Sequence, residues 1–169
     1  MDGTGTGAPK GAEGVIPMEL RVPPPVVFTV CAVIMRALAW ALPALEVSVP
    51  AIIRGGVAVF LFVLGLASGV LGLTALQRAG TTSDPRRPDR AAVLVTSGIY
   101  GYTRNPMYLG LAAALLGWAV WLSNVAALVG VVGFMAYVHR FQILPEERAL
   151  AARFGQAYEE YRRSVPRWL

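Results

Sequence analysis

The residues best suited to chemistry gather in two short segments of an otherwise apolar sequence. The first is 94–108, LVTSGIYGYTRNPMY, in which an arginine and an asparagine directly precede a proline. Asparagine is favoured just before a helix and proline in its first turn, so Asn105 and Pro106 predict a helix start. The N-terminus of a helix beside Arg104 is suited to hold an anion such as a carboxylate. The alternative is that the segment only begins a helix.

Aromatic and acidic side chains extend this picture. Tyr100, Tyr102 and Tyr108 offer ring faces that suit a flat base or a sulfonium cation, although tyrosines also anchor helices at membrane interfaces. The second segment is Glu146-Glu147, where a carboxylate can accept ribose hydroxyls or pair with an ammonium group. Acidic residues also favour a first helical turn through the helix dipole alone, so this simpler role stays open.

The composition narrows the classes of protein. Of 169 residues, 56% are hydrophobic and only 15% are charged, and the mean hydropathy is +0.56. Soluble domains carry about 25% charged residues, so a water-soluble globule is excluded, and so is a disordered chain. Nucleic-acid binding is also excluded, because the net charge of +5 rests on few basic residues and these stand beside long apolar runs. The single cysteine, Cys31, excludes an internal disulfide and a paired-cysteine site, and no metal is expected.

Long apolar runs predict an all-α, polytopic membrane protein. Two runs of about 20 residues are each long enough to cross a hydrocarbon core of about 30 Å. A third run, 107–138, would form a helix of about 48 Å, which is too long for one span. Ser123-Asn124 interrupts it and indicates a hairpin of two short helices. The sequence thus predicts a flexible tail, 1–24, followed by a single membrane domain, 25–169. This domain contains four transmembrane helices in two antiparallel hairpins, at about 26–45, 55–76, 107–121 and 124–139.

The distribution of positive charge predicts the orientation. Lys and Arg accumulate on the cytoplasmic side of membrane proteins. With four spans, the tail, the cytoplasmic loop 77–106 and the C-terminal segment lie on one side with 13 of the 15 basic residues. Only Arg54 lies opposite, and Arg36 lies within the first span, whereas three spans would separate the loop from the C-terminal segment. We therefore predict a multi-pass protein of the cell membrane with both termini in the cytoplasm.

The segment after the last span predicts a cytoplasmic amphipathic helix over 145–163. Its apolar side chains recur at steps of four, four and three, at Leu150, Phe154, Tyr158 and Tyr161. Pro145 is suited to the first turn of such a helix. His139, at the inner end of the fourth span, is interpreted as a packing residue, with a general base as the alternative.

Arg36 is the one charged residue expected inside a span. It lies about eleven residues, or roughly 16 Å, into the first helix, near the middle of a core of about 30 Å. An arginine at that depth is costly unless it faces protein or water. We expect it to face the bundle interior and to meet an anionic group of the substrate or a partner helix. Snorkelling of the side chain is the alternative.

The order of these motifs carries a family resemblance. The run 94–100 is followed by Arg104-Asn105-Pro106-Met107-Tyr108-Leu109-Gly110, by Glu146-Glu147, and then by Leu150, Phe154-Gly155, Tyr158, Tyr161 and Val165-Pro166. Together they resemble the isoprenylcysteine carboxyl methyltransferase family of integral membrane enzymes. They are also similar to the phospholipid N-methyltransferases, and the resemblance covers about residues 75–167.

The resemblance implies S-adenosylmethionine bound at the cytoplasmic edge, with S-adenosylhomocysteine as the product, while a lipophilic small molecule or lipid enters from the bilayer. Residues that match cofactor-contacting positions of the family are Leu94, Val95, Tyr100, Asn105, Pro106, Met107, Tyr108 and Glu146. Arg104 and Glu147 are the motif neighbours that we add to this set.

Two positions depart from the family pattern. The family usually has histidine where Asn105 stands, and an asparagine side chain can hydrogen-bond but cannot titrate near neutral pH. The carboxyl methyltransferases also carry an arginine, implicated in holding the substrate carboxylate, where this chain has Gln142. Arg140 is the nearby candidate to replace it. Arg140 and Asn105 are therefore the predicted catalytic residues, and Arg36 and Gln142 the predicted substrate residues.

These observations predict methyl transfer from S-adenosylmethionine to a lipophilic acceptor, on a carboxylate or another oxygen, nitrogen or sulfur nucleophile. Two alternatives stay open. One is an NADPH-dependent membrane reductase with the topology of the sterol reductases. The other is a small membrane scaffold without enzymatic activity, in which Glu146 and Tyr108 can be replaced without loss of any ligand.

Overall fold

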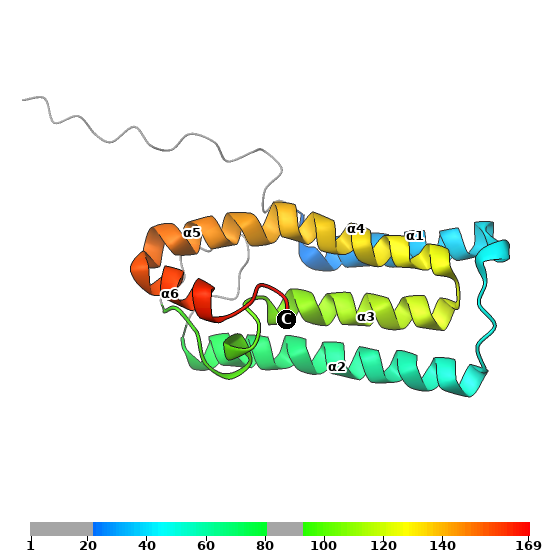
Figure 1. Cartoon of the computed structure of the whole chain (residues 1–169), viewed down its shortest axis with the longest axis horizontal. Helices are drawn as coiled ribbons and strands as arrows, with labels where there is room; N and C mark the ends of the chain where they lie inside the picture. Colours follow the sequence, from blue (N-terminus) through cyan, green and yellow to red (C-terminus); the bar gives the residue numbers. More distant parts are fainter. Residues whose placement is uncertain (1–21, 81–92) are drawn as a thin grey trace, which may run out of the picture.

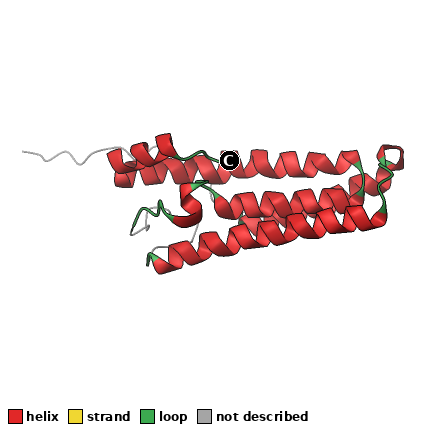
Figure 2. Cartoon of the chain, turned by 60° about the horizontal axis from the view of Figure 1, so that its bottom comes forward, coloured by secondary structure: helices red, strands yellow, loops and turns green. Residues whose placement is uncertain are grey.

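The computed structural model describes residues 22–80 and 93–169 (Figure 1). These residues are helical apart from turns, loops and one isolated bridge, so the all-α class is confirmed for them (Figure 2). Residues 1–21 of the predicted tail and 81–92 of the predicted loop lie outside this part of the chain. Five basic residues of the orientation argument lie there too, namely Lys10, Arg21, Arg86, Arg87 and Arg90.

Helices follow one another along the described chain. The α-helices are α1 (Pro24–Ala41), α2 (Ala51–Arg78), α3 (Pro106–Leu122), α4 (Leu128–Val138), α5 (Leu144–Phe154) and α6 (Gln156–Ser164). Shorter turns are η1 (Pro43–Leu45), η3 (Gly98–Gly101), η4 (Val125–Ala127) and the π-helical η5 (His139–Ile143). Three stretches are long and apolar enough to cross a membrane: Pro24–Ala41, Ala51–Arg78 and Val125–Phe154. Because α3 is apolar but has only 17 residues, the number of spans stays a prediction.

α3 lies at the centre of the bundle, with α2 on one side and α1 and α4 on the other (Figure 1). Its Leu115 belongs to the main core together with Met35 of α1 and Phe134 of α4, and all three are fully buried. By contrast, α1 exposes valines, Ile34 and Trp40, and α2 exposes valines, leucines, isoleucines and phenylalanines along its length. An apolar outer surface of this extent fits a lipid environment better than water.

α2 and α3 approach each other so closely that glycines are required at the contact. A Cβ atom added to Gly65 would overlap the carbonyl oxygen of Gly110, and one added to Gly110 would overlap the carbonyl oxygen of Gly65. A Cβ on Gly117 would lie 2.9 Å from the carbonyl oxygen of Ala58. Small residues that allow such close packing are a main source of attraction between membrane helices. The contact fixes the position of α3 along α2.

We expect Gly65→Ala to lower the free energy of unfolding by about 1–3 kcal/mol, because the new methyl group meets a backbone carbonyl that cannot turn aside. Gly69→Ala is the matched control one turn further along α2, where nothing lies within 4 Å of an added Cβ. The control should be neutral or slightly stabilising, since alanine is the better helix former. Thermal unfolding of both variants in detergent measures the difference, and equal stabilities would argue against the close contact.

The reversal between α3 and α4 lies where the sequence predicts it. Ser123 adopts a left-handed conformation with a φ of 53°, and its hydroxyl donates to the carbonyl of Val47 at 2.8 Å. The side chain of Asn124 accepts from the amide of Ala126 at 2.9 Å and donates to the carbonyl of Leu42 at 2.9 Å. These two polar residues therefore satisfy the backbone at the turn and tie it to the connection between α1 and α2.

The junction of α4 and α5 differs from the prediction. The sequence indicates a break between 139 and 145, with Pro145 opening a new helix, but the chain continues as one rod from α4 through η5 into α5 (Figure 1). A proline inside an α-helix lacks an N–H donor and clashes with the carbonyl four residues before it. The π-helical turn, which widens the helix just ahead of Pro145, accommodates the proline without a break.

The predicted helix 145–163 is two helices. It breaks at Gly155, whose φ of 52° favours glycine, and α6 then folds back beside α5. Leu150 and Phe154 of α5 nevertheless meet tyrosines of α6 in one apolar cluster. The predicted stripe is therefore correct as a set of contacts and wrong as the face of a single helix.

Candidate functional site

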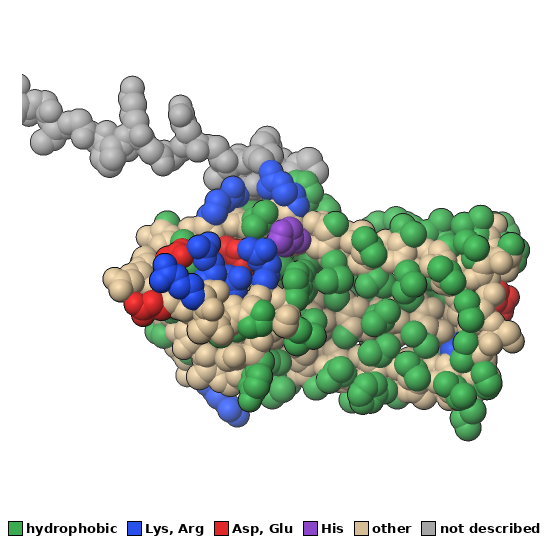
Figure 3. All heavy atoms as spheres, in the orientation of Figure 1, with side chains coloured by type: hydrophobic (Ala, Val, Ile, Leu, Met, Phe, Trp, Pro, Cys, Tyr) green, Lys and Arg blue, Asp and Glu red, His purple; other side chains and the backbone are tan. Residues whose placement is uncertain are grey.

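Charged side chains gather at the end of the bundle formed by α5 and α6, while the rest of the visible face is mainly hydrophobic (Figure 3). Three segments that are distant in sequence meet at this end, namely 94–108, the first turn of α5 and residues 158–168. The two polar motifs singled out in the sequence both lie here. The structure therefore brings them together in one site.

A hydrogen bond between two side chains links these motifs. Tyr108 stands in the first turn of α3 with 5% of its surface exposed, and its hydroxyl donates to Oε1 of Glu146 at 2.5 Å. Glu146 stands in the first turn of α5. On the side of α2, the hydroxyl of Ser68 donates to the carbonyl of Pro106 at 2.7 Å. The start of α3 is thus held from two directions.

Glu147 joins two arginines from separate segments. Its Oε1 lies 2.9 Å from Nη1 of Arg104 and 2.9 Å from Nε of Arg167, and its Oε2 lies 2.7 Å from Nη2 of Arg167. The side chains of Arg104 and Glu147 are only 9% and 11% exposed. The hydrogen bond with Glu147 raises the pKa of Arg167 above its ordinary value. Glu147 is thus engaged by the protein itself.

Residues 165–168, here called the C-terminal strap, run beside the start of α3. The carbonyl of Arg167 accepts from the side-chain amide of Asn105 at 2.9 Å. The carbonyl of Pro166 accepts from the backbone amide of Arg104 at 3.0 Å. The strap therefore fixes the segment ahead of α3 through its own backbone oxygens.

Asn105 has the position of a helix cap but not the role. It immediately precedes α3, yet its side chain makes no hydrogen bond to the first turn of that helix. Its Nδ2 meets Arg167 instead, and its own backbone amide donates to the hydroxyl of Thr103 at 3.2 Å. The predicted helix start at Asn105-Pro106 is thus confirmed, but the side chain of Asn105 binds a carbonyl oxygen of the strap and does not cap the helix.

Tyr100 is buried in η3 beside the site, whereas Tyr102 is 76% exposed. The carbonyl of Tyr100 accepts from the hydroxyl of Tyr161 at 2.8 Å, which ties η3 to α6. Burial raises the pKa of Tyr100, so its hydroxyl stays protonated near neutral pH. Leu94 packs into the apolar cluster of α5 and α6, and Val95 next to it is half-buried.

Gln142 and Arg140 lie on different sides of η5. Gln142 is 1% exposed, and its Nε2 donates to the carbonyl of Val22 at 2.9 Å, while its Oε1 is buried without a partner among the described residues. Arg140 is exposed, with its guanidinium 5.5 Å from the ring centre of Phe141. Residues two apart on a helix do not share a face, so Arg140 does not take the place of an arginine at position 142.

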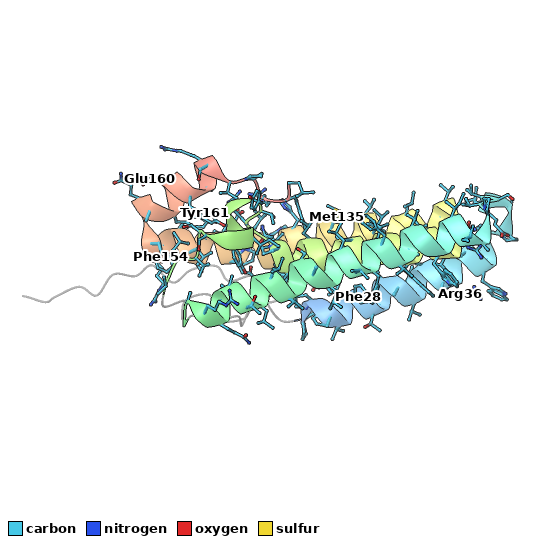
Figure 4. All side chains as sticks on the ribbon, turned by 90° about the horizontal axis from the view of Figure 1, so that it is seen from below. Phe28, Arg36, Met135, Phe154, Glu160 and Tyr161 are labelled. Atoms are coloured by element: carbon cyan, nitrogen blue, oxygen red, sulfur yellow. The ribbon has the colours of Figure 1, made fainter. Side chains whose placement is uncertain are left out.

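Arg36 is not in the bundle interior, and that prediction is wrong because its side chain is exposed. Figure 4 shows Arg36 and Tyr161 at opposite ends of the bundle, so Arg36 is remote from the candidate site. His139 begins η5 and is half-buried, and Met107 beside Tyr108 is half-buried as well.

Sequence reasoning missed three residues that support the site. Arg167 supplies both a guanidinium and a carbonyl, Thr103 donates to that carbonyl at 3.4 Å, and Ser68 holds the start of α3. The only signal for Arg167 in the sequence is its place directly after Val165-Pro166. Ser68 stands in a long apolar run, where a lone serine is a weak signal of any contact.

Comparison with known proteins identifies the family of the chain. The family model of the phospholipid methyltransferases matches residues 53–157, which is more than half of the chain. The chain therefore belongs to the phospholipid methyltransferase family, and the resemblance noted in the sequence is confirmed. No solved structure matches it significantly.

Individual relatives match parts of the chain. A Haemophilus influenzae protein described as uncharacterized is 44% identical over 63 residues, which are 37% of this chain and 100% of that protein. A protein-S-isoprenylcysteine O-methyltransferase of Schizosaccharomyces pombe is 39% identical over 77 residues, 44% of this chain and 31% of that enzyme. The enzyme of the same name from Xenopus laevis is 38% identical over 73 residues, 43% of this chain and 25% of that enzyme. The chain thus spans less than a third of each of these two enzymes.

Proposed function

We propose that the protein is an integral membrane methyltransferase that carries a methyl group from S-adenosylmethionine to a lipophilic acceptor at the membrane edge. The observation that carries the proposal is the hydrogen bond between Tyr108 and Glu146, where the two motifs meet. Both residues stand in the first turn of a helix within the matched range 53–157. Membership of the family supports the class of reaction.

Two buried polar atoms without partners fit the amino-acid part of S-adenosylmethionine. Nε of Arg104 is a buried donor and Oε1 of Gln142 a buried acceptor, and neither has a partner among the described residues. Buried polar groups are almost always hydrogen-bonded, so both atoms are suited to a ligand. The carboxylate of an amino acid suits the donor, and its ammonium group suits the acceptor. The carboxylate of Glu146 then accepts hydrogen bonds from the ribose hydroxyls, and the ring of Tyr100 packs against the ligand.

The protein's own contribution to this reaction is positioning and exclusion of water. S-adenosylmethionine, when bound, supplies an electrophilic methyl group on a positively charged sulfur. Tyr108 orients the carboxylate of Glu146, and the C-terminal strap holds the segment ahead of α3. Asn105 holds the strap and has no titratable proton to transfer. The acceptor presents a carboxylate or another oxygen, nitrogen or sulfur nucleophile from the apolar side.

We also propose that all four apolar segments span the cell membrane, with the α5–α6 end in the cytoplasm. α3 has 17 residues, or about 26 Å of helix, so it spans a locally thinned bilayer or has its ends covered by protein. Among the described residues, Arg54 stands near Trp121 at the opposite end, with 5.4 Å between its guanidinium carbon and the ring centre. The charges at the α5–α6 end support this orientation.

Thermal unfolding of the purified full chain in detergent tests the proposed activity. S-adenosylmethionine and S-adenosylhomocysteine should raise Tm, because a ligand that binds only the folded state stabilises it by about 2.7 kcal/mol at a hundred times its Kd. NADPH should have no effect. Stabilisation by NADPH alone would indicate a reductase, and no response to any of the three ligands would indicate a scaffold. Either result would contradict the proposal.

A further inference from the structure

An open groove of about 610 Å³ runs along one side of α1. Its wall is mainly apolar and includes Phe28, Ala32, Ala37 and Trp40 of α1 together with Trp118 of α3. The two alanines leave room between the larger rings. The indole N–H of Trp118 donates to the carbonyl of Ala32 at 3.1 Å, which fixes this ring as part of the wall.

Among the described residues that line this groove, Arg36 is the only charged one, and α1 contains no aspartate or glutamate. Arg36 lies about 18 Å from the start of α1 and about 7.5 Å from its end, at 1.5 Å per residue. An arginine at this depth is costly without water or an anionic partner. Its position therefore calls for an anion at the groove.

We propose that the groove binds one anionic phospholipid, with the phosphate on Arg36 and an acyl chain directed along the groove toward Phe28. The planar guanidinium matches a pair of phosphate oxygens. The helix from Phe28 to Trp40 is about 18 Å long, close to the thickness of one leaflet, about 15 Å. Trp40 is 78% exposed near the end of α1, and tryptophans mark the headgroup level of a bilayer.

Charge and position favour a lipid over the other possible occupants. In a symmetric dimer the same face meets itself, so the two Arg36 side chains would be brought together, and like charges at an interface are unfavourable. The methyl acceptor belongs beside Tyr108, and Figure 4 shows Arg36 far from the α5–α6 end. The lipid site is thus separate from the proposed active site and does not depend on the proposed function.

Native mass spectrometry of the purified full chain, titrated with phosphatidylglycerol or phosphatidylcholine of the same acyl chains, tests this inference. We expect the wild-type protein to retain one phosphatidylglycerol with about tenfold higher affinity, the difference that one charge-assisted contact supplies. Arg36→Gln should reduce this preference to about twofold or less, by loss of that contact. Arg78→Gln is the matched control, because it removes an exposed arginine of α2 outside the groove and should keep the preference.

A second variant distinguishes the contribution of the groove's shape to lipid binding from that of the Arg36 charge. Ala37→Phe fills the groove and keeps Arg36, so it should weaken the binding of both lipids by about the same factor. A wild-type protein that does not distinguish the two lipids, or a preference that survives Arg36→Gln, would overturn the inference. A lipid-free dimer that Ala37→Phe dissociates would overturn it as well, since the groove would then belong to a second copy.

Discussion

Glu146→Ala is expected to reduce the affinity for S-adenosylhomocysteine by about 100-fold. The substitution removes a carboxylate proposed to hold the ligand, and it leaves the buried hydroxyl of Tyr108 without its acceptor. A hydrogen bond to a charged group contributes about 1.5–3 kcal/mol, and every 1.4 kcal/mol, roughly, is a tenfold change in Kd. Isothermal titration calorimetry of the purified full chain in detergent measures the loss.

Two further variants sharpen this experiment. Tyr108→Phe keeps the ring and removes only the hydroxyl, so the affinity should fall by about tenfold, as expected for loss of one hydrogen bond. Glu160→Ala is the control, because it removes an exposed carboxylate of α6 that accepts from Gln156 of the same helix. It should bind as the wild type does. If Glu146→Ala unfolds at the wild-type temperature without ligand and still binds as tightly, the cofactor lies elsewhere.

Features that depend on neighbouring residues were predictable from the sequence. The lengths of the apolar runs predict α1 and α2, since a span needs about 20 such residues. The polar pair Ser123-Asn124 predicts the reversal after α3, because its side chains can satisfy the backbone of a turn. That reversal returns the chain to the end it left, so the loop that contains Arg104 and the segment that contains Glu147 lie at one end of the bundle.

Features that depend on distant contacts were not predictable. The carbonyl that holds the side chain of Asn105 belongs to Arg167, which is 62 residues away in the sequence. Pro145 normally opens a helix, and its place inside a continuous rod depends on the π-helical turn before it. Because an arginine in lipid is energetically costly, the sequence predicts Arg36 in the interior of the bundle, but Met35 occupies that position. One residue further along, a rotation of about 100° turns Arg36 outward.

Glu147→Ala is expected to lower the free energy of unfolding by about 3 kcal/mol, the lower end of the range for breaking a buried ion pair. The substitution leaves the guanidinium of Arg104, with only 9% of its side chain exposed, without its carboxylate partner. Arg167 is 32% exposed, so water compensates part of its own loss. Thermal unfolding in detergent measures the change. Glu159→Ala is the control, because its ion pair with Arg162 at 2.7 Å is solvent-exposed and should contribute about 0.5 kcal/mol or less.

Arg167→Ala separates the two ways in which the C-terminal strap is held. It removes the guanidinium but keeps the carbonyl that accepts from Asn105, so it should destabilise the fold by only about 1 kcal/mol. If Glu147→Ala proves no more destabilising than Glu159→Ala, desolvation of the charges offsets their attraction. The strap is then held by its backbone oxygens and by Trp168, which packs against the main core. In that case Glu147 fixes the geometry ahead of α3 without adding to stability.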